Sequence, residues 1–150
     1  MKGDDNMRPD KISILIKNLA LEFDKLAIPE LTTYDLTPSQ YKIIKYLMYN
    51  DGTDVRQRDI EKAFSMTNPT VTGILQNLEK SGWIERIENE NDARSKVIKL
   101  TKKSLNRKDE LYEIGESLES KFTCGLSKEE KKELKILLKK MINSLEKKNK

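Results

Sequence analysis

The residues best suited to chemistry lie in one short stretch, NPTVTGILQNLEK, at positions 68–80. An α-helix over this stretch would place its apolar residues within about a third of the circumference. The opposite face would carry small or polar side chains, which can approach base edges and phosphates in a DNA major groove about 12 Å wide. This face comprises Pro69, Gly73, Gln76, Asn77 and Lys80, and the apolar stripe comprises Val71, Ile74, Leu75 and Leu78.

Residue types also mark the two ends of this helix. Asn68 is a favoured N-cap, Pro69 is preset for the first turn, and Gly82 can adopt the left-handed conformation that ends a helix. The free N–H groups from Asn68 onward carry a partial positive charge, so they can attract a phosphate without lysine or arginine. Asn68 is therefore a candidate DNA contact.

Two features of the outward face leave two interpretations open. A mid-helix glycine costs about 1 kcal/mol relative to alanine, so Gly73 is either tolerated or useful because it lets the backbone approach DNA closely. Gln76 and Asn77 can pair bidentately with adenine. The alternative is that they are only solvated, as exposed amides on helices often are.

Asp92 and Arg94 form a second candidate site. They are two residues apart, so in an extended segment both lie on one side, where the carboxylate can orient the guanidinium. Arginine suits a narrow minor groove, where the potential is most negative. The alternative is a solvated surface ion pair worth ~0–1 kcal/mol.

Three helices are predicted ahead of this stretch. Apolar residues at three- and four-residue steps indicate a first helix that ends near Ile28 and Pro29. Thr37 and Gln40 form a capping box around Pro38, which predicts a second helix over residues 38–49. A short helix is expected between positions 55 and 65. The stripe of the first helix comprises Ile12, Leu15, Ile16, Leu19, Phe23 and Leu26.

Beyond Gly82 the pattern changes to short β-branched and aromatic segments, residues 83–88 and 96–100, which predict a β-hairpin with a long tip. Two helices should follow, the second opened by a capping box of Ser127 and Glu130. Helix, tight link, helix and hairpin is the order of a winged helix-turn-helix. The predicted fold class is thus mainly α with a small β-wing. The buried positions expected in the last two helices are Leu111, Ile114, Leu118 and Phe122, then Leu134, Leu138, Met141 and Leu145.

Composition narrows the function classes. The 150 residues suit one domain or two closely packed lobes, and the net charge is +4. Residues 101–150 carry 14 basic and 9 acidic groups, whereas residues 51–100 carry 8 and 9. Because the middle of the chain is nearly neutral, nucleic-acid binding there must come from the local placement of a few basic groups.

The sequence offers little for catalysis. It has no histidine and a single cysteine, Cys124, so the commonest general base and metal ligand is missing. It also lacks a nucleophile elbow, a Walker A loop and a dinucleotide-binding glycine pattern. We therefore expect no catalytic residue, metal or cofactor, since an enzyme would have to use carboxylates or lysine alone.

A cytoplasmic location and no membrane partner are expected. Apolar runs are far shorter than the roughly 20 residues that span a bilayer. The start MKGDDNMRPD has no apolar signal region.

Two segments together resemble the MarR family of bacterial transcriptional regulators. NPTVTGILQNLEKSGWIER is similar to the family's recognition helix and first wing strand, and DARSKVIKLT to its D-x-R…L-T wing signature. The resemblance covers nearly the whole chain, 1–150. It implies a winged helix-turn-helix lobe over residues 37–101, flanked by dimerisation helices over 10–36 and 102–147.

The resemblance also implies a function. A homodimer would bind a pseudo-palindromic operator sequence-specifically and act as a repressor. The apolar stripes of the terminal helices fit such a dimer, in which a second copy covers them. The alternative is that these helices fold back on their own chain.

The resemblance also implies roles for individual residues, by their position in the family's motifs. Thr70, Thr72, Gln76 and Asn77 match recognition-helix positions that face DNA, and Asp92 and Arg94 match the wing pair. Many relatives have arginine where this chain has Gly73 and Asn77. We therefore predict that other basic groups supply the missing electrostatics: Arg94, Lys96, Arg56, Arg58 and, on the recognition helix, Lys80.

Family members often bind small aromatic ligands between the dimerisation helices and the DNA-binding lobe. Tyr34, Tyr41, Tyr46 and Phe64 lie near that junction in sequence and are candidate pocket residues, although tyrosines at helical spacing are also typical of a core. Other members sense oxidants through cysteine. For Cys124 we expect a buried structural thiol instead.

The alternative function is that of a protein-interaction module. Winged-helix folds also occur as protein-interaction modules without sequence-specific DNA binding. A helix that binds a protein groove is expected to carry a central aromatic or aliphatic anchor. The polar outward face of residues 68–80 favours DNA.

Overall fold

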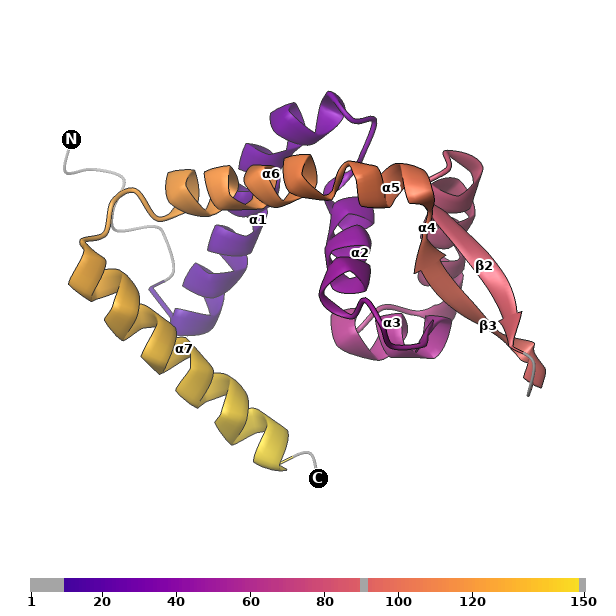
Figure 1. Ribbon diagram of the computed structural model, residues 1–150. Helices are drawn as coiled ribbons and strands as arrows, with labels where there is room; N and C mark the ends of the chain where they lie inside the picture. Colours follow the sequence, from indigo (N-terminus) through magenta and orange to yellow (C-terminus); the bar gives the residue numbers. More distant parts are fainter. Residues whose placement is uncertain (1–9, 90–91, 149–150) are drawn as a thin grey trace.

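The computed structural model describes residues 10–89 and 92–148, and side chains are described outside residues 89–94 (Figure 1). The fold is mainly helical with a small antiparallel sheet, as predicted. No helix in this described part is both long and apolar enough to cross a bilayer. The elements are α1 (Ile12–Thr32), α2 (Pro38–Tyr49), β1 (Val55–Arg56), α3 (Gln57–Phe64), α4 (Asn68–Lys80), β2 (Ile84–Asn89), β3 (Asp92–Leu100), α5 (Lys102–Asn106), α6 (Lys108–Phe122) and α7 (Lys128–Lys148).

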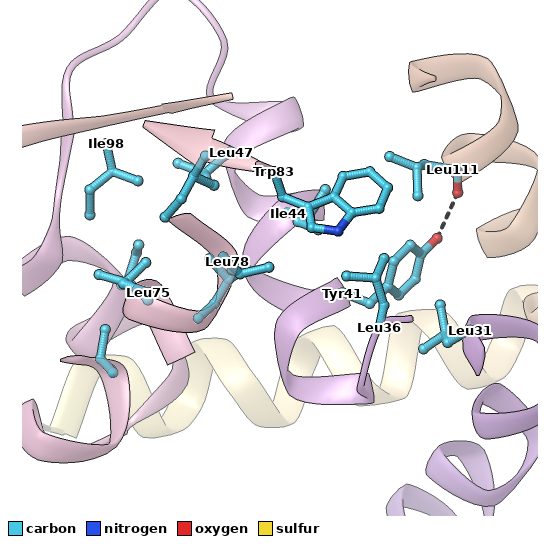
Figure 2. Packing of buried hydrophobic residues seen from close by; sticks show 14 of the residues in the cluster. Leu31, Leu36, Tyr41, Ile44, Leu47, Leu75, Leu78, Trp83, Ile98 and Leu111 are labelled. Atoms are coloured by element: carbon cyan, nitrogen blue, oxygen red, sulfur yellow. Dashed lines mark hydrogen bonds between the residues drawn. The ribbon is translucent and has the colours of Figure 1, made fainter. Parts of the chain in front are cut away.

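The core lies where α2, α3 and α4 meet the sheet, the end of α1 and α6 (Figure 2). The predicted inner stripe of α4 is confirmed, because Val71, Leu75 and Leu78 are fully buried and Ile74 is partly buried against the same core. Their burial fixes the rotation of α4 about its axis, so its polar face is turned outward. Other core residues include Ile43, Ile44, Leu47, Ile60, Trp83 and Ile98.

The sheet has the strand order β1-β3-β2, with both pairs antiparallel. β3 pairs with β2 from Ile84 opposite Leu100 to Asn89 opposite Asp92. The strand therefore starts at Asp92, and the long tip predicted between residues 88 and 96 is wrong. β1 was not predicted, because two residues are too short for an alternating pattern and their pairing with Val97 and Ile98 is non-local.

Helix α1 does not end at Ile28 and Pro29 but continues to Thr32. Proline removes one helical hydrogen bond and disfavours the preceding turn. Ala27 and Leu31, on either side of it, are both buried. Their packing outweighs the local penalty, so the predicted end was wrong.

Helix α4 begins one residue earlier than expected. Thr67 occupies the N-cap, Asn68 is the first helical residue, and Asn68 is therefore not the cap. The Thr67 backbone is extended, with φ −74° and ψ 156°. Its hydroxyl lies 2.9 Å from the hydroxyl of Thr70.

Two capping predictions are confirmed. The Thr37 hydroxyl accepts from the Gln40 N–H at 3.1 Å, and the Gln40 side chain accepts from the Thr37 N–H at 2.9 Å. Ser127 and Glu130 make the same reciprocal pair before α7. These contacts satisfy N–H groups that the helix itself leaves free.

The terminal helices only partly cover one another. α6 packs on α1, where the rings of Phe23 and Phe122 meet edge to face with centroids 5.1 Å apart. Figure 1 shows α7 turning back from the end of α6 and running diagonally below it, past the start of α1. No residue of α7, through Lys148, is buried. The prediction that Leu134, Leu138, Met141 and Leu145 are buried is thus wrong for a single chain, because none of its described segments covers them.

Candidate nucleic-acid interface

The outward face of α4 is open to solvent. Gln76, Asn77 and Lys80 are exposed, and Gly73 is half-buried. A Cβ atom built on Gly73 would meet nothing within 4 Å outside its own helix backbone. The fold itself therefore gives no steric reason for glycine at this position.

The side chain of Gln57 forms hydrogen bonds between α3 and the first turn of α4. Its Nε2 donates to the Thr72 hydroxyl at 2.8 Å and lies 3.4 Å from the Asn68 carbonyl oxygen. Asn68 and Thr70 are exposed, whereas Thr72 is half-buried. Sequence analysis missed Gln57, because only the tertiary packing of α3 against α4 brings positions 57 and 72 together.

A basic cleft of about 420 Å³ lies between α3, the start of α4 and the wing strands β2 and β3. It unites the predicted contacts Arg56 and Arg58 with Asn68 of α4 and Lys96 of the wing. Four cationic side chains line it against one carboxylate, so its local charge is positive. The lining residues are Arg56, Gln57, Arg58, Glu61, Asn68, Arg86, Ser95, Lys96 and Ile98.

Arg86 is a second cleft residue that sequence analysis missed. Its Nε donates to a carboxylate oxygen of Glu79 at 3.0 Å, which connects β2 to the last turn of α4. The Arg86 side chain is only 19 % exposed. This ion pair ties the wing to the recognition helix, so the two elements present their outer surfaces together.

The predicted wing pair is only partly placed. Asp92 and Arg94 belong to β3, but their side chains lie outside the described part of the structure. The ion pair between them stays a prediction. Lys96 is described and exposed, whereas Lys80 is exposed near the far end of α4 and does not line the basic cleft.

The predicted ligand residues are engaged in packing. Tyr41 is buried, and its hydroxyl donates to the Leu111 carbonyl at 2.7 Å (Figure 2). Burial, followed by the nearby Tyr49, raises the pKa of Tyr41 to about 12. A Cβ on Gly115 would lie 3.1 Å from this hydroxyl, so glycine lets α6 approach α2 closely.

The other three aromatic residues are half-buried. Tyr46 and Phe64 meet edge to face with centroids 5.7 Å apart. Tyr34 lies instead beside the Arg107 guanidinium, 4.5 Å from its ring centroid. A ligand site built from these rings stays a prediction.

A separate crevice of about 340 Å³ lies between α2, α6 and α7. Two strongly exposed tyrosines line it, Tyr49 at 71 % and Tyr112 at 53 % exposure. The ammonium of Lys45 lies 5.9 Å from the Tyr49 ring centroid. Sequence analysis did not predict this crevice, because its walls come from three separate helices.

Cys124 is exposed, so the predicted burial of this thiol is wrong. The residue lies just beyond the end of α6, in the turn that leads to α7. Turns of this kind run over the surface because their backbone polar groups need solvent.

Comparison with known proteins identifies the family. Residues 34–95 match the model described as the MarR family. The chain is 34% identical over 95 residues to the HTH-type transcriptional regulator FarR of Neisseria gonorrhoeae, a match that covers 63% of this chain and 61% of FarR.

Two solved structures extend the likeness over most of the chain. The S. aureus MepR–DNA complex is 31% identical with a TM-score of 0.80, covering 91% of this chain and 99% of that one. A cysteine-to-serine mutant of E. coli MarR complexed with operator DNA is 27% identical with a TM-score of 0.77, covering 87% and 92%. The chain therefore belongs to the MarR family of winged helix-turn-helix, DNA-binding transcriptional regulators.

Proposed function

We propose that this protein is a homodimeric repressor that binds a pseudo-palindromic operator. In each protomer, α4 enters a major groove and the wing reaches the adjoining minor groove. One observation carries the proposal: Asn68 at the start of α4 and Lys96 of the wing line the same basic cleft as Arg56 and Arg58. The sugar-phosphate strand that separates the two grooves would then cross this cleft, where the cations neutralise phosphates.

The named relatives support this proposal. The MepR and MarR structures that resemble this chain were crystallised with DNA, MarR with its operator. The polar outer face of α4 lacks the apolar anchor expected of a helix that binds a protein groove. DNA is thus favoured over a protein partner.

An apolar groove supports the homodimer. It lies between α1 and α7 and measures about 700 Å³. Its walls are almost entirely aliphatic, and the side chains stay 37–65 % exposed in a single chain. Exposed apolar surface of this kind marks an interface, and a second copy would cover both helices at once. The apolar lining residues are Ile12, Leu15, Ile16, Leu19, Leu134, Leu137, Leu138, Met141 and Leu145.

Selection of bound fragments from random duplex DNA tests the function. We expect the full-length protein to enrich an inverted repeat with half-site centres about 34 Å apart, or one helical turn. Enrichment of a single unrepeated site would contradict the dimeric operator. Failure to enrich any sequence would overturn sequence-specific binding.

The proposed function includes a small aromatic effector. The crevice between α2, α6 and α7 suits such a ligand, because Tyr49 and Tyr112 offer ring faces and Lys45 offers a cation. Benzoate and phenol are simple probes for it. Either should raise the unfolding temperature of the wild type but not of Tyr112→Ala, and no shift in either protein would remove this site from the proposal.

A further inference from the structure

The contact between Gln57 and Thr72 has a defined polarity. Asn at position 68 contributes a backbone carbonyl, which can only accept a hydrogen bond. The Gln57 atom that faces both this carbonyl and the Thr72 hydroxyl, at 3.4 and 2.8 Å, must therefore be the amide nitrogen. Gln57 donates, and the Thr72 oxygen accepts.

This polarity determines what the Thr72 hydroxyl can still do. A helical threonine commonly turns its hydroxyl proton back to the carbonyl four residues earlier, which here belongs to Asn68. That carbonyl already lies against the Gln57 amide. The Thr72 oxygen also accepts a hydrogen bond from Gln57 through one lone pair. The hydroxyl proton of Thr72 is therefore free to be donated to an acceptor outside the helix.

We infer that Gln57 is a positioning residue that makes Thr72 a hydrogen-bond donor to DNA. The inference rests on the proposed function and deepens it. The acceptor is either a phosphate oxygen or a base-edge atom such as purine N7, guanine O6 or thymine O4. Gln57 and Asn68 both line the basic cleft, so the donor lies at the edge of the surface that would meet the DNA strand.

A double-mutant cycle tests the inference. The variants are Gln57→Met, Thr72→Val and the double variant, all with unchanged charge and similar side-chain volume. The probe is a duplex selected by the wild type from random DNA. We expect each single variant to bind about three- to ten-fold more weakly, the loss of one hydrogen bond, and the double variant to bind no more weakly than Thr72→Val.

A matched control uses Thr70, whose hydroxyl contacts Thr67 and not Gln57. Gln57→Met should weaken binding equally in the wild type and in Thr70→Val. If Gln57 acts in stability alone, Gln57→Met should lower the unfolding temperature but leave the affinity of the folded protein for the duplex unchanged. Additive losses in the Gln57 and Thr72 cycle, or wild-type affinity in Gln57→Met, would overturn the inference.

Single-base variants of the duplex identify the acceptor. If it is a base edge, Thr72→Val and Gln57→Met lose the preference at one position in each half-site. If it is a phosphate, both weaken all duplexes equally. Both outcomes support the inference. A wild type that selects no duplex at all would instead overturn the proposed function.

Discussion

At the scale of single residues, two helical glycines of this protein meet opposite demands. Gly115 of α6 faces Tyr41, and a Cβ there would lie 3.1 Å from the tyrosine hydroxyl. Gly73 of α4 faces open space. Packing within the chain therefore explains glycine at position 115. At position 73, glycine is either required by a binding partner or simply tolerated.

Substitution of Gly73 separates the two interpretations. Gly73→Ala should raise the free energy of unfolding by up to about 1 kcal/mol, because helix propensity improves and no atom obstructs the new methyl group. Gly73→Arg adds a cation on the face of α4 that is proposed to meet DNA. We expect it to bind duplex DNA more tightly, with a log–log salt slope steeper by about one. Weaker binding by both variants would show instead that DNA approaches too closely for a side chain.

Tyr41 gives a pH-dependent prediction. Its folded pKa of about 12 lies above the ordinary value of 10.0, so the folded state holds the proton more tightly than the unfolded state. Its contribution to stability is full below pH 10 and is lost as the pH rises towards 12. Tyr41→Phe lacks both the hydrogen bond to Leu111 and this titration.

Denaturant unfolding of the two proteins checks this. Near pH 8 the Phe variant should be less stable by about 1 kcal/mol. Between pH 10 and 12 the difference should shrink, because only the wild type loses stability through this group. A difference that stays constant across that range would contradict the assignment.

At the scale of elements, the interface depends on three segments that meet at the basic cleft. α3 supplies Arg58, α4 supplies Asn68, and the wing supplies Arg86 and Lys96. The Arg86–Glu79 ion pair and the Gln57–Thr72 hydrogen bond join these segments. In the proposed complex, the cleft cations would therefore act on the DNA backbone as a group, without reading bases.

Removal of one cleft cation should have a uniform effect. Arg58→Gln should weaken binding to every duplex by a similar factor and reduce the salt slope by about 0.9. Lys62→Gln is the matched control, since Lys62 is exposed on the same helix but does not line the cleft. Equal salt slopes for Arg58→Gln and the wild type would exclude Arg58 from phosphate contact.

At the scale of the whole molecule, a single chain leaves a large apolar surface exposed. The core around α2, α3 and α4 extends to the end of α1 and to α6, whereas the start of α1 and α7 leave an aliphatic groove open between them. The chain belongs to a family of transcriptional regulators and is not an enzyme. In the proposed dimer, the second copy would fill this groove. Burial of apolar surface at roughly 25 cal/mol per Å² would then drive association.

A charge in the groove should prevent that association. Leu137 is 51 % exposed in one chain, so Leu137→Glu should fold but dissociate into monomers, visible by light scattering. Operator affinity should fall at least tenfold, because each lobe would bind its half-site alone. Lys132→Glu changes charge on the same helix outside the groove and should stay dimeric. A wild type that is itself monomeric would refute the dimer.

Local patterns in the sequence were enough to predict several features. The capping boxes at Thr37 and Ser127, the inner stripe of α4 and the fold class follow from contacts between residues a few positions apart, whose geometry the helix itself fixes. The polar face of α4 follows from the same periodicity. The resemblance to the MarR family then predicted that the partner is DNA.

The remaining features could not be predicted from local patterns, because they depend on contacts between residues distant in sequence. The two-residue strand β1 exists through its pairing with β3, and α1 runs through Pro29 because Leu31 is buried. The basic cleft and the Gln57–Thr72 bond also join separate segments. Periodicity assigns a residue to a face of its own helix, but what covers that face is set by packing. For that reason the sequence predicted the stripe of α7, whereas only the structure revealed that a single chain leaves it open.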